Sequence, residues 1–121
     1  MDVVREFHTA AIRLHVLHYA TADEVHGAWM IRELRGHGHE IGPGTLHPLP
    51  HRMEQTGLLT SHHDVVDGRQ RRPYRATEHG HEVLATCHRA LVELAGEILT
   101  EGDLIGSDDS RTRALDDTHW Q

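Results

Sequence analysis

The sequence predicts a mainly α-helical domain with one two-stranded β-hairpin, followed by a long C-terminal helix. Three observations support this fold class. Apolar residues recur at helical spacing in three segments before Gly57, and the Asp67-Gly68 pair then separates two extended stretches, 58–66 and 70–77. Helical spacing returns over residues 78–101. A chain of 121 residues is long enough for one such domain with one core.

Two amphipathic helices are expected before the third. The first is indicated by apolar residues at spacings of three and four, and it should end near Ala20. Its apolar stripe consists of Val3, Phe7, Ala10, Leu14 and Leu17. The second is capped by Thr21 or Asp23 and ended by Gly36 and Gly38, because glycine commonly terminates helices. Its apolar residues are Val25, Met30, Ile31 and Leu34.

A third helix is predicted to begin at residues 43–45 and to end at Gly57. One face should pack into the core and carries Leu46, Leu49 and Met53. The opposite face is polar and free to dock, and it carries His47, Pro48, His51, Arg52 and Gln55. Pro50 lies beyond the expected first turn, so it should remove a backbone hydrogen bond or kink the helix.

The Asp67-Gly68 pair predicts a tight hairpin, because this pair readily adopts the positive backbone angles that such a turn requires. Arg69, Arg71 and Arg72 follow the turn, where a hairpin tip can reach a phosphate or the minor groove. A polar helix face beside a basic hairpin is the outline of a winged helix-turn-helix. We therefore predict a DNA-binding domain with a two-stranded β-wing.

The last helix carries an apolar stripe close to heptad spacing, which predicts that it pairs with a second helix. The stripe consists of Val83, Leu84, Cys87, Leu91, Leu94, Ala95 and Ile98. Three segments are thus expected: a winged-helix domain at 1–77, whose first helix also lies in the dimer interface, a C-terminal dimerisation helix at 78–102, and an acidic, flexible tail at 103–121. Trp120 in this tail is either without a role or a further docking point.

The net charge of −7 is unusual for a protein that binds DNA, but the charges are segregated. Residues 41–75 contain five arginines and three acids, whereas residues 103–121 contain five aspartates and two arginines. Phosphate binding depends on the electrostatic field of charges within roughly 8 Å, so a negative net charge of the whole chain does not exclude DNA binding. The single Cys87 excludes an intrachain disulfide and a cysteine-based zinc cage. No membrane span or signal peptide is evident, which predicts a cytoplasmic protein.

The chain resembles a short member of the PadR family of bacterial transcriptional regulators over roughly residues 12–101. Five sequence blocks occur in the family's order. They are His26-Gly27, the run Gly42-Pro43-Gly44-Thr45-Leu46-His47-Pro48-Leu49, Glu54 with Gly57-Leu58-Leu59, Asp67-Gly68-Arg69, and Tyr74-Arg75-Ala76-Thr77 with Gly80. The resemblance implies a homodimer, usually a repressor, whose first and last helices interleave with those of its twin while the paired third helices enter successive major grooves.

The chain departs from the family pattern at several positions. The family usually has tyrosine at the positions of Ala28 and His47, and Pro50 is an additional proline. These changes predict either altered DNA specificity or weakened DNA binding. Some short relatives trap planar drugs against a tryptophan of the last helix, which has no aromatic residue in this chain. A flat multidrug pocket is thus disfavoured.

Specific residues are expected to form each site. The DNA-binding set is Thr45, His47, His51, Arg52, Gln55, Arg69, Arg71, Arg72 and Tyr74, with arginine suited to guanine and glutamine to adenine. The dimer-interface set is Phe7, Leu14, Leu84, Leu91, Leu94 and Ile98. Trp29, Cys87 and His88 are expected to contact a small-molecule effector.

Fourteen histidines are a second unusual feature of the chain. His47 and His51 lie one helical turn apart, and His81 and His88 could share a face of the last helix. No H-E-x-x-H motif occurs, so neither a metal nor any other cofactor is assigned. A metal- or pH-responsive sensor on the same fold stays open, since histidine titrates near physiological pH.

Two further alternatives concern function. A winged-helix interaction module that has lost DNA binding stays open. An enzyme is not expected, because no nucleophile, acid-base pair or cofactor loop appears at usable spacing. The predicted function is a homodimeric DNA-binding repressor of the PadR type that binds double-stranded DNA at a palindromic operator. Its release by a small effector is an open part of this prediction.

Overall fold

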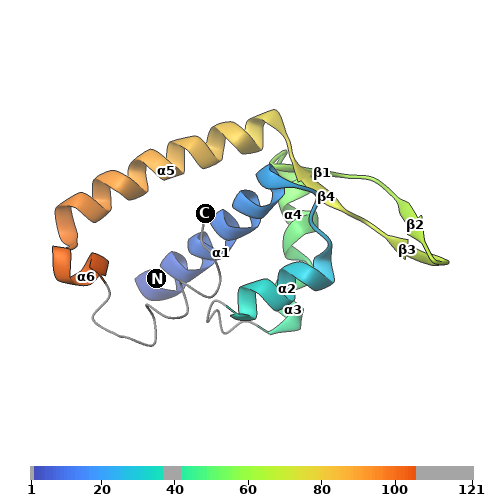
Figure 1. Cartoon of the computed structure of the whole chain (residues 1–121), viewed down its shortest axis with the longest axis horizontal. Helices are drawn as coiled ribbons and strands as arrows, with labels where there is room; N and C mark the ends of the chain where they lie inside the picture. Colours follow the sequence, from blue (N-terminus) through green and yellow to red (C-terminus); the bar gives the residue numbers. More distant parts are fainter. Residues whose placement is uncertain (1, 37–41, 106–121) are drawn as a thin grey trace. The chain divides into compact units, whose positions relative to one another are not determined.

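The computed structural model describes residues 2–36 and 42–105, except for the side chains of Pro43 and Thr45. It divides into two compact units, 1–87 and 88–121, whose boundary lies within helix α5. The elements are, in chain order (Figure 1), α1 (Val3–Ala22), α2 (Gly27–Gly36), α3 (Pro43–Leu46), α4 (Leu49–Gln55), β1 (Leu59–Ser61), β2 (Asp64–Val66), β3 (Arg69–Arg71), β4 (Tyr74–Ala76), α5 (Glu78–Ile98) and α6 (Glu101–Ile105). The predicted fold class, mainly α with a β-wing and a C-terminal helix, is confirmed. No helix in the described ranges has the length and apolarity needed to cross a membrane.

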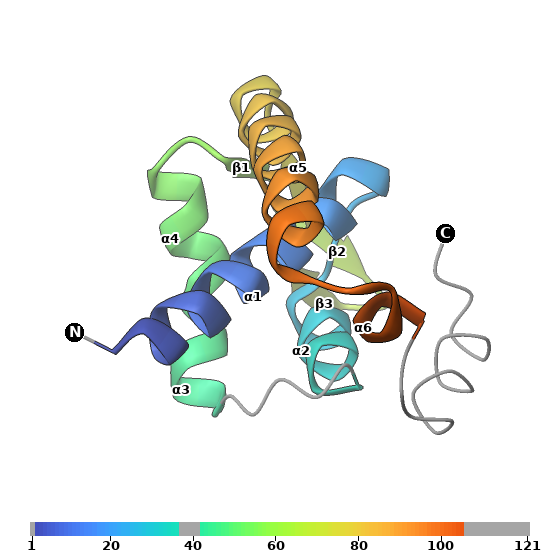
Figure 2. The ribbon, with the colours of Figure 1, turned by 90° about the vertical axis from the view of Figure 1, so that its left-hand side faces the viewer.

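Helix α1 passes through the first unit with α4 on one side and α2 on the other (Figure 2). Asp2 caps it, because the Asp2 carboxylate accepts hydrogen bonds from the amides of Val4 and Arg5. The face that enters the core carries Ile12, Val16, Leu17 and Ala20. The stripe predicted from the sequence therefore shares only Leu17 with the buried face. Most of the other stripe residues are solvent-exposed in a single chain, with Phe7 60% exposed.

The start of α2 differs from the sequence prediction. Val25 does not belong to this helix but forms an isolated antiparallel bridge with Tyr74 of β4. Its amide donates to the Tyr74 carbonyl at 2.8 Å, and the Tyr74 amide donates back to the Val25 carbonyl at 2.9 Å. Met30 and Leu34 of α2 are buried, as their spacing predicted. Gly38, the second expected terminator, lies outside the described residues.

The predicted third helix is two helices, because the chain turns at His47 and Pro48 between α3 and α4. Pro48 is the N-cap of α4, which places Pro50 at its second position. The first intrahelical bond of α4 joins the Arg52 amide to the Pro48 carbonyl at 3.0 Å. The interruption between α3 and α4 agrees with the expectation that Pro50 removes a bond or kinks the helix, because Pro50 has no amide hydrogen to donate to Leu46 in a continuous helix. At the second position of α4 it costs no bond, since amides of the first turn have no helical acceptor. Pro50 is buried together with Leu49 and Met53.

The hairpin has one unbroken antiparallel register from Leu59↔Ala76 at its base to Val66↔Arg69 at its tip. Its strands are two short pairs, β1 with β4 and β2 with β3, because pairing lapses around His62, His63, Arg72 and Pro73. Pro73 has no amide hydrogen to donate across the sheet. Asp67 and Gly68 form the turn with φ values of 53° and 76°, as predicted for a tight hairpin.

Thr77 joins the hairpin to α5. Its hydroxyl donates to the Gly57 carbonyl and accepts from the Gly80 amide, while its own amide donates to the Leu58 carbonyl at 3.1 Å. Gly80 is buried against Leu58, and an added Cβ would collide with the Leu58 carbonyl oxygen. Glycine at this position thus allows the first turn of α5 to lie directly against the chain that leads into β1.

Helix α5 ends at Ile98 rather than at residue 101, and the short helix α6 follows. The Asp103 carboxylate accepts from the Thr100 amide and hydroxyl, while the Asp103 amide donates to that hydroxyl. These bonds from Thr100 hold the pKa of Asp103 below its ordinary value. The sequence prediction missed this reciprocal cap and placed residues 103–105 in the tail. Residues 106–121, the rest of that predicted tail, lie outside the described residues.

Candidate nucleic-acid interface

Helix α4 separates its buried and exposed residues as the sequence predicted. Leu49 and Met53 enter the core with Leu46, whereas His51, Arg52 and Gln55 are exposed, as is His47 in the preceding turn. We call these four exposed residues the reading face. They offer guanidinium, amide and imidazole groups, which can form hydrogen bonds with base edges in a major groove. The fifth predicted contact on this side, Thr45, has its side chain outside the described part of the structure.

The end of α4 fixes the direction of the hairpin. Gly57 has a φ of 83°, its amide donates to the Glu54 carbonyl at 3.0 Å, and the Leu58 amide donates to the Met53 carbonyl at 2.9 Å. This pair of bonds is a Schellman motif, which reverses the chain directly into β1. The Glu54 carboxylate also accepts from the amide and hydroxyl of Ser61, at 3.0 and 2.8 Å. The reading face and the base of the hairpin are therefore held together by hydrogen bonds at both ends of β1.

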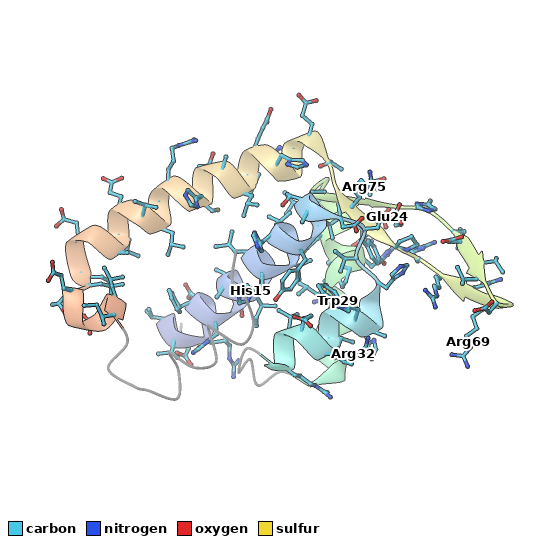
Figure 3. The ribbon with its side chains drawn as sticks, viewed as in Figure 1. His15, Glu24, Trp29, Arg32, Arg69 and Arg75 are labelled. Atoms are coloured by element: carbon cyan, nitrogen blue, oxygen red, sulfur yellow. The ribbon has the colours of Figure 1, made fainter. Side chains whose placement is uncertain are left out.

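The three arginines that follow the turn are all exposed. Arg69 projects from the end of the hairpin (Figure 3). The Arg72 guanidinium lies 3.0 Å from Nε2 of His63 across the hairpin. Arg75, at the base, is 3.3 Å from the Glu24 carboxylate and forms an ion pair with it. Positive charge is thus available along β3, whereas Arg75 is partly neutralised.

Tyr74 differs from the other predicted DNA contacts. It is only partly exposed, packs against the buried core cluster and forms the bridge with Val25. Its position at the base of the hairpin separates it from the arginines of β3. The side chain thus has an evident structural role where the sequence suggested a contact with DNA.

An open cleft lies between β3 and the corner where α1 leads into α2. Its volume is about 970 Å³. We call it the wing cleft, and its charged and aromatic lining includes Tyr19, Trp29, Arg32, Arg69, Arg71 and Arg72. Sequence patterns did not reveal it, because its two walls are about forty residues apart in the chain and are joined by long-range contacts such as the bridge between Val25 and Tyr74. The one sequence signal was Trp29, an expected effector contact.

The sequence profile described as the Transcriptional regulator PadR-like family matches residues 16–86. The chain is also 56% identical over 96 residues to the transcriptional regulator Rv3488 of Mycobacterium tuberculosis. The aligned region covers 79% of this chain and 90% of that protein. The chain belongs to the PadR-like family. This PadR-like chain is thus a transcriptional regulator with a DNA-binding winged helix, which confirms the resemblance seen in its motifs.

Solved PadR structures share the fold. A PadR family transcriptional regulator from Eggerthella lenta superposes with a TM-score of 0.68 at 28% identity, covering 87% of this chain and 90% of that one. A PadR-like transcriptional regulator from Bacillus cereus has a TM-score of 0.67 at 20% identity, covering 83% and 96%. The second likeness concerns the fold alone.

The predicted dimer residues differ in their exposure in this PadR-like chain. Phe7 on α1 is exposed, as are Leu91, Leu94 and Ile98 on the second half of α5, which are 52%, 49% and 65% exposed. Leu84, in contrast, packs against the core cluster of the first unit. Leu14 is half-buried. The exposed group is available to a partner, whereas Leu84 already has contacts within its own chain.

The three effector candidates are not brought together in one described cavity. Trp29 lines the wing cleft, but Cys87 and His88 do not. Cys87 is a partly buried free thiol, and His88 is exposed. Within the described ranges, no three histidine, cysteine or carboxylate side chains are grouped as a metal site would require. The histidine-rich composition therefore has no corresponding metal cluster in that part of the chain.

Tyr19 lies in the wall of the wing cleft, with its ring edge-on to Trp29 at a centroid distance of 5.1 Å. Burial, aided by the negative charge of Glu33, raises the pKa of Tyr19 from 10.0 to about 12. Its buried hydroxyl has no hydrogen-bond partner among the described residues, and the same is true of Nδ1 of His26. The environment thus favours the neutral phenol over the phenolate.

Tyr19→Phe is expected to remove a pH dependence of stability. Because the folded state raises the pKa, the folded protein holds this proton more tightly than the unfolded chain does. The resulting stabilisation is complete below pH 10 and is lost as the pH rises toward about 12. Urea unfolding across this pH range should show that the free energy of unfolding of the wild type falls as the pH rises. The fall should be smaller for Tyr19→Phe. At neutral pH the variant should be as stable or up to about 1 kcal/mol more stable, because an unpaired hydroxyl is removed. Identical pH profiles would contradict this account.

Proposed function

We propose that the chain is a homodimeric repressor that binds a roughly palindromic operator. The observation that carries this proposal is the exposed reading face of α4 joined through β1 to a hairpin with three exposed arginines. In such an arrangement the helix contacts base edges in the major groove, and the hairpin arginines contact phosphates beside it. The place of action would be the compartment that holds the DNA, the cytoplasm.

Specificity in this proposal comes from the reading face. Arg52 is suited to the two acceptors of guanine, and Gln55 to the donor and acceptor of adenine. His47 and His51 add hydrogen-bonding groups beside them. Thr45 at the start of this region would contact DNA as well. Release by a small effector is a further part of the proposal, and Trp29 is the candidate side chain with access to a described cleft.

Pairing of two chains is supported by the apolar residues that a single chain leaves exposed. On α5 they include Leu91, Leu94 and Ile98, at spacings of three and four. On α1 they include Val3 and Phe7, which are 76% and 60% exposed. Exposed apolar surface of this kind commonly marks a protein interface. A two-fold dimer would present two reading faces to half-sites about one helical turn of DNA apart.

Arg71→Ala is expected to weaken binding to every DNA sequence by roughly ten- to a hundredfold, because a charged hydrogen bond to phosphate contributes about 1.5–3 kcal/mol. The slope of log affinity against log salt should become shallower by about one for each phosphate that the protein no longer neutralises. Fluorescence anisotropy with labelled duplexes at several salt concentrations measures both quantities.

Gln55→Ala serves as the matched variant for the reading face. This variant should leave the salt slope unchanged. It should reduce the discrimination between bases at one operator position by about 1–3 kcal/mol. If Arg71→Ala left both affinity and salt slope unchanged, the assignment of β3 to phosphates would be wrong. A Gln55→Ala protein with undiminished preference at every position would exclude that residue from base contact.

A further inference from the structure

The wing cleft is lined by more arginines than carboxylates. Arg69, Arg71 and Arg72 line it from the hairpin, and Arg32 lines it from α2. Within the described part of the chain, Arg32, Arg69 and Arg71 form no ion pair with a carboxylate. Four guanidiniums around one cleft indicate an anionic ligand that can accept several hydrogen bonds.

Two carboxylates, Asp23 and Glu24, also line the cleft. Glu24 is engaged by Arg75 at 3.3 Å. Asp23 accepts the amide of Glu24 at 2.7 Å. Both carboxylates thus have partners, and neither is bonded to an arginine of the cleft.

The remaining wall is aromatic. Trp29 is 39% exposed and packs edge-on against Tyr19, which leaves a ring surface available on the same helix as Arg32 (Figure 3). The two buried polar atoms without a partner among the described residues, Tyr19 Oη and His26 Nδ1, also belong to residues of this wall. A volume of about 970 Å³ is sufficient for a nucleotide-sized ligand. Guanidiniums beside a flat indole match the chemistry of a phosphate ester attached to a ring.

We propose that the wing cleft binds the phosphate of a nucleotide, with Arg32 holding it from the α2 side and Trp29 beside the sugar or base. The phosphate belongs either to the DNA strand that passes the hairpin or to a free nucleotide that acts as an effector. The first source rests on the proposed DNA binding, whereas the second does not. Arg32 is the informative residue, because it lies outside the hairpin and the reading face.

The test compares Arg32→Gln with Arg35→Gln, an exposed arginine of the same helix that does not line the cleft. Both are made in a full-length Trp120→Phe background, so that Trp29 is the only tryptophan. In the DNA arm, Arg32→Gln should lose about tenfold in affinity and flatten the salt slope, whereas Arg35→Gln should not. In the nucleotide arm, adenosine monophosphate is titrated without DNA while Trp29 fluorescence is recorded.

Each outcome decides the proposal. If only Arg32→Gln loses DNA affinity, the phosphate belongs to the operator strand. If the nucleotide causes a saturable change in Trp29 fluorescence that Arg32→Gln abolishes, the phosphate belongs to a free nucleotide. Arg32→Lys should recover part of either effect, since lysine keeps the charge but not the bidentate geometry. The proposal is overturned if Arg32→Gln matches Arg35→Gln in both arms. If the parent protein retards no DNA, the proposed function fails, and the nucleotide arm still decides this proposal.

Discussion

Gly80→Ala is expected to lower the free energy of unfolding by about 3 kcal/mol, as overpacking against a rigid neighbour typically does. The added methyl group would meet the Leu58 carbonyl oxygen, with the Leu58 carbonyl carbon at 3.2 Å and a Leu17 methyl at 3.4 Å. Two of these three atoms belong to the backbone, so a side-chain rotation cannot relieve the collision. The start of α5 or the chain into β1 would have to move.

Displacement at Gly80 also threatens the hydrogen bonds around it. The Gly80 amide donates to the Thr77 hydroxyl at 3.0 Å, and that hydroxyl donates to the Gly57 carbonyl. Gly57 belongs to the Schellman motif that ends α4, so the disturbance reaches the segment that holds the reading face. We therefore expect DNA affinity to fall together with stability.

Gly96→Ala is the matched control, because it lies in the same helix and an added Cβ there would meet nothing within 4 Å. It should leave stability unchanged or raise it by up to about 1 kcal/mol, through the better helix propensity of alanine. Urea unfolding followed by circular dichroism, at equal protein concentration, measures both variants. Equal stabilities for the two variants would contradict the packing described at Gly80.

Leu94→Glu is expected to convert the proposed dimer into a monomer and to reduce operator affinity by roughly 100-fold or more, because two half-sites would no longer be bound as one unit. Leu94 is 49% exposed and shares its face of α5 with Leu91 and Ile98. A carboxylate placed at the centre of this apolar face would be buried without a partner in the dimer.

Ala85→Glu is the control for Leu94→Glu, since Ala85 is exposed and lies on the opposite side of α5 by helical spacing. It introduces the same charge but should leave the dimer and its operator affinity intact. Sedimentation velocity gives the oligomeric state, and anisotropy gives the affinity. Full dimerisation of Leu94→Glu would remove this face of α5 from the interface.

Some parts of the fold could be predicted because local chemistry decides them. Asp67 and Gly68 define the turn, and the turn defines the register of the hairpin up to Leu59 and Ala76. The buried residues Leu46, Leu49 and Met53 were also predicted, although the helix around them is divided in two. Their spacing places them on one side in either arrangement, so the prediction did not depend on a continuous helix.

Other parts could not be predicted because they depend on contacts between distant segments. Helix α1 has two apolar stripes, and periodicity alone does not tell which one enters the core of its own chain. The stripe with Phe7 is the more conspicuous, yet the core takes Ile12, Val16 and Ala20. The wing cleft depends on the bridge between Val25 and Tyr74, which no local pattern contains.

Binding of a specific operator by the reading face and the hairpin arginines together is the property on which the proposed function depends. The most direct measurement is selection of the genomic DNA fragments that the full-length protein retains, followed by binding titrations with those fragments and with random DNA. We expect fragments that share an inverted repeat with half-sites about one helical turn apart, bound roughly 1,000-fold or more tighter than random DNA. Retention of no fragment above random DNA, even at low salt, would contradict the proposed function.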